Sequence, residues 1–534
     1  MSAVAARMAE VTPLFERARS VIDDGLAATA GINALTRFHT ALADVRRSLG
    51  RPMSVAVVGR IKAGKSSAVN ALLGDELLAT GKEELTYNVN VLRHGESAGL
   101  RVHFKDGEPP AAYDFAELDC LSTRSNEHRE ILNRISYIEV FSSNPLLEQF
   151  DLVDTPGLDS SFVEDSDNTR RWLRLEPSEI YRMSEEELRG ADAVLYLFRY
   201  SVAASDDVIM REFHGMGMEH ASPLNAIGVL TRGDENWVPG GEDPMEEAGR
   251  VAERLSAESR RSNIFFTVIP ISAKLGLAAR RLGEDAHAAL GSLGNRFARQ
   301  RILDELTDAR KFLAEDGNGA RRALWDELGR YGIWLAWQRV AEGGTLADVR
   351  AALHDVSGLD RLSRLLTSHF GARASLIKVA GSVRRGRAAC SEHLPTLAGE
   401  KAQLVRTIRE ELEAIETEEP AFRLLQVLYD YYDGSIGFTP DEEEQLKQAT
   451  GEYGSALDAR LGLKLDFRQL LDTAEQRARE RVWHWRQRAT AGGSDNDASA
   501  ARELALAYDD LIEEVRRLRL LILGANGSEG TLGE

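Results

Sequence analysis

The chain has 534 residues and a formal net charge of -19, with 43% apolar and 28% charged residues. This length exceeds what one compact core supports, so two or three domains are expected. The acidic balance argues against a protein held to nucleic acid or anionic lipid by a general positive field. Its two cysteines, Cys120 and Cys390, give no disulfide framework or metal-ligand cluster and suit a reducing cytosol.

The N-terminal residues show no basic region followed by an apolar stretch, so no signal peptide is expected. The sequence also contains no apolar run of about 18 residues, the minimum that predicts a transmembrane helix. We therefore expect a cytoplasmic protein. Any contact with the inner face of the cell membrane is expected to be peripheral.

The first fifty residues are predicted to be helical. Leu35, Phe38, Leu42, Val45 and Leu49 recur at alternating steps of three and four, which places them on one helix face. Two interpretations stay open at this point: a helix packed on its own domain, and one helix of an interdomain bundle.

From Met53 onward, short apolar runs alternate with helical stretches. Runs typical of strands fall at residues 54–58, 87–93, 100–104, 137–141, 150–153, 193–198, 226–230 and 265–269. This alternation predicts an α/β domain with a largely parallel central sheet. After about residue 275 the strand signals fade, and helical stretches at 302–313, 320–340 and 359–370 complete or decorate this domain.

Long helices are predicted from residue 372 onward. One includes 404–415 and is interrupted near Pro395 and Gly399; another covers 441–488, with weak points at Gly451, Gly454 and Gly462. A turn-rich break at 491–497 precedes a last helix, whose heptad seam contains Leu504, Tyr508, Leu511, Val515, Leu518 and Ile522. Because the N-terminal helix carries a matching seam, we predict that both chain ends join in one antiparallel bundle. The predicted limits are 1–50 for the N-terminal bundle segment, 51–371 for the α/β domain, 372–524 for the rest of the bundle and 525–534 for a flexible tail.

A complete P-loop pattern stands between the first strand and a helix. It reads Gly59-Arg60-Ile61-Lys62-Ala63-Gly64-Lys65-Ser66 and is followed by Ser67. Its glycines let main-chain N–H groups turn toward phosphates, and the helix N-terminus adds positive potential. Lys65 is predicted to reach the β- and γ-phosphates, and the Ser66 hydroxyl is predicted to bind Mg²⁺.

Three further motifs follow strands in the order that a guanine-nucleotide site requires. Asp154-Thr155-Pro156-Gly157 offers a carboxylate for the metal and an amide for the γ-phosphate. Thr231-Arg232-Gly233-Asp234 offers a carboxylate that can pair with N1–H and the N2 amine of guanine, a donor edge that adenine lacks, while the stem of Arg232 could cover the base. The backbone of Ser272-Ala273-Lys274 could close over the guanine.

This order of motifs resembles the GTPase superfamily and, more narrowly, the dynamin-like proteins. Residues 73–81, Thr86 and residues 91–95 resemble the first switch of bacterial dynamin-like proteins, and the strongest likeness is to actinobacterial dynamin-like GTPases, including the isoniazid-inducible kind. The specific motifs cover about residues 53–275. The resemblance implies a P-loop GTPase domain with a helical neck or stalk, Mg²⁺ as cofactor, hydrolysis of GTP to GDP, and self-association through GTPase domains, with a related subunit as a further partner.

The resemblance also implies catalytic roles. Thr86 would close over Mg²⁺, and Gly157 would sense the γ-phosphate. Leu158 stands where many small GTPases carry glutamine, so water is not oriented by that side chain. Lys62 occupies the place of a residue that helps dynamin-like proteins hold a monovalent cation, which its ammonium could replace; a solvated P-loop charge is the alternative. The polar segment 159–190 is either a dimer contact or a passive insertion.

A segment crowded with aromatic and aliphatic residues, 421–438, is the candidate for peripheral membrane contact. A core helix capped by an acidic loop is the alternative, and the pairs Trp334/Trp337 and Trp483/Trp485 are interpreted as packing residues. We predict a GTPase that couples hydrolysis to self-association and membrane remodelling or tethering. The alternatives are a soluble assembly switch without membrane contact and a nearly inactive nucleotide-binding scaffold.

Overall fold

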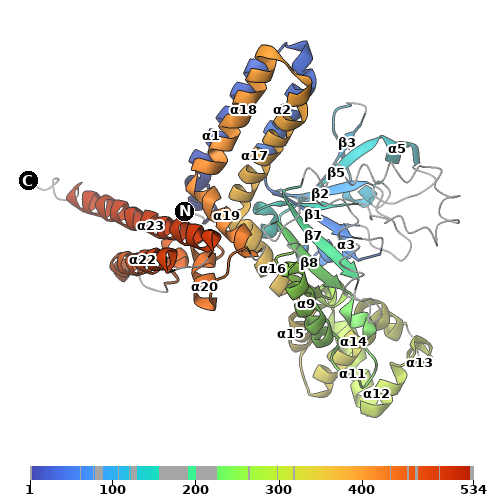
Figure 1. Ribbon diagram of the computed structural model, residues 1–534. Helices are drawn as coiled ribbons and strands as arrows, with labels where there is room; N and C mark the ends of the chain where they lie inside the picture. Colours follow the sequence, from blue (N-terminus) through green and yellow to red (C-terminus); the bar gives the residue numbers. More distant parts are fainter. Residues whose placement is uncertain are drawn as a thin grey trace, which may run out of the picture. The chain divides into compact units, whose positions relative to one another are not determined.

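The computed structural model describes residues 3–528 except 60–61, 76, 79–87, 106–107, 119–120, 122–128, 156–190, 200–224, 262–264, 297–298, 315, 317–318, 433–434, 454–455, 464–466 and 492–493. The chain divides into two compact units (Figure 1). The α/β unit comprises residues 54–366. The helical unit combines residues 1–53 with residues 367–534.

The described part of the α/β unit contains a nine-stranded sheet in the order β4-β3-β5-β2-β6-β1-β7-β8-β9. The strands are β1 (Ser54–Gly59), β2 (Val89–His94), β3 (Gly99–Phe104), β4 (Ala111–Tyr113), β5 (Ile135–Ser142), β6 (Asp151–Asp154), β7 (Ala193–Arg199), β8 (Ala226–Thr231) and β9 (Val268–Ile271). From β6 to β9 neighbouring strands are parallel, whereas the β2–β6, β3–β5 and β3–β4 pairs are antiparallel. The predicted α/β class with a mainly parallel sheet is confirmed, and the apolar β1 is buried along almost its whole length, as a covered parallel strand should be.

Helices of the α/β unit cover the sheet and then form a cluster of their own after β9 (Figure 1). They are α3 (Lys65–Leu73), α5 (Arg129–Arg134), α9 (Pro244–Arg261), α10 (Ala273–Arg281), α11 (Glu284–Arg296), α12 (Arg299–Glu305), α13 (Ala309–Leu313), α14 (Ala320–Ala341), α15 (Leu346–Ser357) and α16 (Leu359–Leu365). The cluster has a core that includes Leu275, Leu328 and Leu353. Trp334 and Trp337 lie in this core, 8% and 6% exposed, as packing residues.

Four helices of the helical unit share one core. They are α1 (Ala3–Thr29), α2 (Thr36–Leu49), α17 (Ala374–His393) and α18 (Gly399–Glu418), and Figure 1 shows them side by side. Phe38 and Leu42 of α2 meet Val383 of α17 and Leu412 of α18 in this core. The seam of the N-terminal helix therefore belongs to a bundle with helices that follow the α/β unit in sequence.

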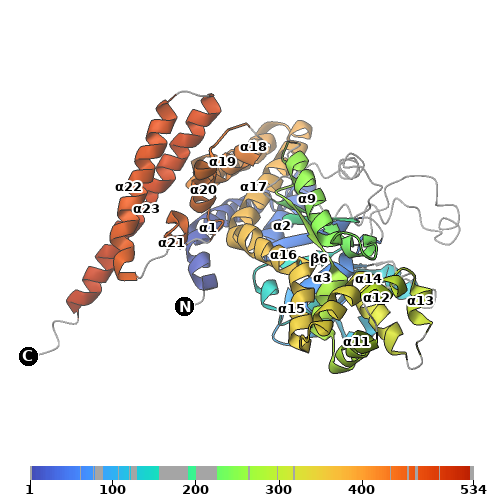
Figure 2. The same cartoon turned by 90° about the horizontal axis from the view of Figure 1, so that it is seen from below.

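The second group of helices corrects two predictions. It consists of α19 (Pro420–Tyr432), α20 (Pro440–Ala449), α21 (Leu457–Leu461), α22 (Phe467–Thr490) and α23 (Asp495–Ser528). The prediction of one long helix over 441–488 is wrong, because Gly451 and Gly462 adopt positive φ angles of 75° and 66° and the chain turns there. Among the described residues, α23 packs mainly on α22 (Figure 2), since a short connection makes α22 its immediate antiparallel neighbour.

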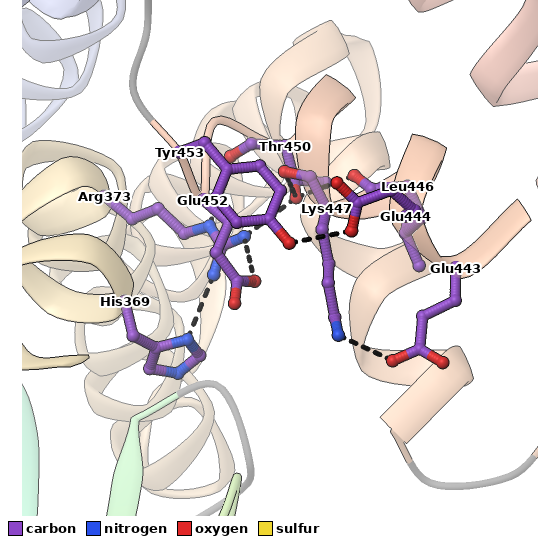
Figure 3. Close-up of polar contacts among 9 residues, drawn as sticks. All are labelled: His369, Arg373, Glu443, Glu444, Leu446, Lys447, Thr450, Glu452 and Tyr453. Atoms are coloured by element: carbon purple, nitrogen blue, oxygen red, sulfur yellow. Dashed lines mark hydrogen bonds and ion pairs between the residues drawn. The ribbon is translucent and has the colours of Figure 1, made fainter. Parts of the chain in front are cut away.

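A buried polar cluster holds the turn after α20 (Figure 3). The Arg373 guanidinium donates to Thr450 O at 3.1 Å, to Thr450 Oγ1 at 2.8 Å and to Glu452 at 3.1 Å. Its Nη1 also lies 3.1 Å from His369 Nδ1. Arg373 and Glu452 are both buried, so each charge depends on the other for compensation.

The aromatic-rich segment 421–438 is packed inside the helical unit. Its large side chains that are buried are Phe422, Leu424, Val427, Leu428, Tyr432 and Ile436. The core-helix alternative fits these buried residues, while Leu425, Tyr429, Tyr431 and Phe438 are partly exposed. Trp485 is fully buried, but Trp483 is 68% exposed, so the packing interpretation is wrong for Trp483. No described helix combines the length and the apolar character needed to span a bilayer.

Candidate functional site

The predicted nucleotide-binding residues of the described chain follow the carboxyl ends of neighbouring strands. Gly59 ends β1, Asp154 ends β6 and Thr231 ends β8, while Ser272 follows β9 directly. Because these strands belong to the parallel stretch β6-β1-β7-β8-β9 of the sheet, their carboxyl ends meet at one edge. Residues far apart in sequence are thereby brought into one site.

The P-loop backbone depends on two glycines. A Cβ at Gly59 would lie 2.5 Å from Leu197 O, and Gly64 adopts a left-handed φ of 88°. Lys65 begins α3 and folds back across the loop, where its Nζ donates to Gly59 O at 3.1 Å. Burial lowers the pKa of the Lys65 amine, while the nearby Asp154 carboxylate opposes that shift. The ammonium is thus positioned over the loop that would surround a phosphate chain.

The next residues of α3 bring hydroxyl groups to the metal-binding position. Ser66 Oγ donates to Asp154 Oδ2 at 3.0 Å. Asp154 is fully buried, which raises the pKa of its carboxyl to about 6 against the opposing effects of Lys65, Ser66 and Asn90. Its Oδ1 is buried without a hydrogen-bond partner among the described residues.

The oxygen atoms of Ser66 and Asp154 are of the kind that Mg²⁺ prefers. The ion prefers oxygen ligands, few carboxylates and phosphate oxygens, so one hydroxyl, one carboxylate and a bound nucleotide are sufficient. The uncompensated Asp154 Oδ1 is an oxygen that a cation would satisfy. Within the described ranges no cluster of three or more His, Cys, Asp or Glu side chains could hold a metal by itself. Thr86, the other predicted ligand, lies outside the described residues.

The predicted base-reading residue, Asp234, lies in the short helix η4 (Gly233–Asn236). It is 7% exposed, and burial raises the pKa of its carboxyl while a hydrogen bond with Ser272 lowers it. Arg232 precedes it in a left-handed conformation with φ of 62° and binds Glu235 at 2.7 Å. Its Nε lies 3.8 Å from the place of a Cβ at Gly64, so the Arg232 stem reaches from the base motif to the P-loop.

Thr231 joins these two motifs directly. Its hydroxyl lies 2.7 Å from Ala63 O in the P-loop and 2.9 Å from Phe198 O at the end of β7. The sequence predicts Thr231 as a nucleotide-binding residue. In the structure its hydroxyl contacts the backbone of the P-loop and of β7. This hydroxyl fixes the relative position of the phosphate and base motifs.

Two supporting residues have no predicted role in the sequence analysis. Asn70, fully buried in α3, pairs with the backbone of Leu78 through bonds of 2.7 and 2.9 Å, within the stretch 73–81 that resembles the first switch. Thr155 donates to Val57 O of β1 at 2.9 Å and fixes the end of β6. The only sequence signal for Asn70 is an amide within an otherwise apolar helix.

The remaining predicted residues lie in varied environments. Ser272 accepts a hydrogen bond from Leu275 N at 3.2 Å and caps α10, and Ala273 and Lys274 form its first turn. Ala63 is buried, Ser67 is partly exposed, and Lys62 is exposed with φ of 65°. Gly157, Leu158 and the segment 159–190 lie outside the described residues.

The mainly parallel sheet and the P-loop before α3 are typical of P-loop nucleotide-binding proteins, and Thr231-Arg232-Gly233-Asp234 stands as the predicted guanine motif. Residues 55–232 match the family model described as the dynamin family. The chain is 27% identical over 502 residues to the isoniazid-induced protein IniC of Mycobacterium tuberculosis. This alignment covers 89% of this chain and 93% of that protein. It is also 33% identical over 114 residues to dynamin-like protein 2 of Campylobacter jejuni. That alignment covers 21% of this chain and 18% of that protein.

A solved structure of an oligomerised bacterial dynamin pair aligns with 96% of this chain and 79% of its own, at 15% identity and a TM-score of 0.33. The family match and the long alignment with IniC identify the class more narrowly than the fold does. Residues 55–232 carry a dynamin-family GTPase domain, and the chain is similar to dynamin-like proteins of bacteria.

Proposed function

We propose that this chain binds GTP with Mg²⁺ and hydrolyses it to GDP. The convergence of Lys65, Ser66 and Asp154 at the end of β1 carries the proposal. Lys65 would neutralise the β- and γ-phosphates, and the amides of the P-loop from Gly59 to Ser67 would surround them. Ser66, Asp154 and Thr86 would hold Mg²⁺, which when bound neutralises charge on the phosphate oxygens.

The base and the attacking water have separate residues in this proposal. Asp234 selects guanine, with Thr231, Arg232, Ser272, Ala273 and Lys274 forming the surrounding wall. Gly157 would donate its amide to the γ-phosphate. Leu158 cannot orient water, so the water would depend on backbone groups and on charge near Lys62.

Calorimetry with GDP and GTP, followed by a phosphate-release assay, tests this function. Lys65→Ala should abolish turnover, because the ammonium over the loop is lost. The matched control is Lys311→Ala, which removes an exposed amine paired with Asp304 at 3.2 Å in the same unit. Unchanged turnover of the Lys65 variant, or ATP displacing both guanine nucleotides, would remove the proposal.

Lys62 is proposed to supply the positive charge that a monovalent cation supplies in related proteins. Lys62 is exposed and has a left-handed backbone conformation, so its side chain is accessible to solvent. The hydrolysis rate should then be the same in K⁺, Na⁺ or a large inert cation. A strong K⁺ requirement would instead leave Lys62 as a solvated charge.

We further propose that hydrolysis is coupled to self-association through GTPase domains, and through this to membrane remodelling or tethering. Membership of the dynamin family supports the coupling. Two observations favour a second candidate, a soluble assembly switch: the net charge of -19 and the burial of Phe422, Leu424, Val427, Leu428, Tyr432 and Ile436 in the segment 421–438. Light scattering with GDP and a transition-state mimic tests association. Liposome co-sedimentation with and without a GTP analogue separates the two candidates.

A further inference from the structure

Helix α14 is broken where it meets the base motifs. Gly329 has φ of 67° and ψ of 179°, a backbone region that essentially only glycine adopts. A Cβ at this position would lie 3.3 Å from Lys274 Cδ and 3.6 Å from Lys274 Nζ. The break therefore leaves room for the lysine stem of the Ser272-Ala273-Lys274 motif.

Two residues further along α14, Tyr331 reaches the start of α9. Its hydroxyl donates to Asp243 Oδ2 at 2.7 Å, while Asp243 Oδ1 accepts from Met245 N at 2.8 Å. Tyr331 is 4% exposed, and its contact with the partly exposed Asp243 is partly buried. The Tyr331 hydroxyl thus fixes the carboxylate that begins α9.

The first turns of α9 in turn support the base-reading residue. A Cβ at Gly233 would lie 3.0 Å from Ala248 Cβ and 3.1 Å from Met245 Sδ, so the residue before Asp234 packs directly on α9. No side chain larger than hydrogen fits between them without a shift. The position of the Asp234 carboxylate therefore depends on where α9 begins.

Helix α14 also holds the other end of η4. The Trp237 ring lies 5.7 Å from the Tyr331 ring and stacks on Trp334 at 5.8 Å. Arg330 Nη1 donates to Trp237 O at 3.3 Å. Three supports of the base site, namely α9, Trp237 and Lys274, therefore meet one stretch of α14.

We propose that residues 329–334 of α14 position Asp234 for guanine, with Tyr331 as the principal positioning residue. This inference rests on the proposed function, and it assigns part of the guanine selectivity to a helix outside the four nucleotide-binding motifs. Tyr331 acts through Asp243, α9 and Trp237. The phosphate half of the site has its own supports in Thr231 and the P-loop glycines.

The test compares Tyr331→Phe with the wild type by calorimetry, using Mg²⁺ with GDP, inosine diphosphate and pyrophosphate. Loss of this partly buried hydrogen bond should weaken GDP binding by about 3- to 10-fold. Pyrophosphate, which contacts only the phosphate half, should bind within about 2-fold of the wild type. Inosine diphosphate lacks the N2 amine, so its affinity should fall less than that of GDP. Tyr113→Phe on the distant β4 is the matched control.

Equal weakening of GDP and pyrophosphate, or no weakening of either, would overturn the inference, since a residue that only stabilises the core changes both ligands alike. Arg330→Met provides a second variant that keeps Tyr331 and should also weaken GDP selectively. If the wild-type protein binds pyrophosphate but no guanine nucleotide, the proposed function fails instead, so the two failures are distinguishable.

Discussion

Replacing Thr231 by valine measures how strongly the phosphate and base motifs are joined. Valine keeps the shape of threonine but removes the hydroxyl that bonds to Ala63 O and Phe198 O. A buried carbonyl left without its donor costs about 1–3 kcal/mol. Over the roughly 310 residues of the α/β unit, an unfolding entropy of about 2.1 cal/mol/K per residue converts this cost to a fall in Tm of about 2–5 °C.

The assay is thermal unfolding of the nucleotide-free chain by circular dichroism, paired with GDP calorimetry. Thr307→Val is the matched control, because the Thr307 hydroxyl bonds to Asp304 O on the exposed surface, where water can replace it. Its Tm should change by less than about 1 °C. GDP affinity of the Thr231 variant should fall by about 3- to 10-fold, since a freed P-loop must be ordered again on binding. A Tm and an affinity equal to those of the control would refute the reasoning.

Three further outcomes are expected. Asp234→Asn should weaken GDP and favour xanthosine diphosphate, whose carbonyl at position 2 accepts from an amide; unchanged preference in a competition assay would exclude Asp234 as the base reader. Burial raises the pKa of the Asp154 carboxyl from its ordinary 3.8 to about 6, so protonated Asp154 contributes about 3 kcal/mol to the stability of the nucleotide-free fold below about pH 4. This contribution is lost as the pH rises through 6. Asp154→Asn should flatten that part of the Tm–pH profile, and an unaltered slope contradicts the assignment. Arg373→Met leaves Glu452 buried and uncompensated, which should cost about 3–5 kcal/mol by denaturant unfolding; recovery in the double variant with Glu452→Gln is the check on the mechanism.

Much of the sheet could be predicted because its strands are apolar runs. Apolar composition alone predicts a strand at Val55 to Val58 and at the buried stretch of β7. The three-residue β4, with the sequence Ala-Ala-Tyr, has no such run and was missed. The sequence pattern also does not predict that β2 pairs antiparallel with β6, because strand direction depends on the path of the connections.

The broken helix after α20 shows where periodicity fails. A glycine within a helix costs only about 1 kcal/mol, so Gly451 and Gly462 permit a break without requiring one. What favours the break is the polar cluster: Arg373 bonds to Thr450 O, a carbonyl that is available because α20 ends there. Arg373 lies 77 positions earlier in the chain, and no local pattern indicates that contact.

The nucleotide site divides in the same way. Lys65, Ser66, Asp154 and Asp234 are candidates from the sequence because each belongs to a short motif next to a strand. Their supports are not: Thr231 and Ala63 are separated by 168 positions, and Tyr331 and Asp243 by 88. Such pairs form only after the strands have aligned, and the residue types involved are common in loops and cores.

The two kinds of support make different demands on a nucleotide. Thr231 bonds to the P-loop itself, so its loss should weaken pyrophosphate and GDP together. Tyr331 reaches the site through Asp243, α9 and Trp237, which support η4 and Asp234, so its loss should weaken GDP more than pyrophosphate. If both variants instead gave the same ratio of pyrophosphate to GDP affinity, the phosphate and base halves would act as one rigid body, and selectivity for guanine would reside in Asp234 and its immediate neighbours without help from α14.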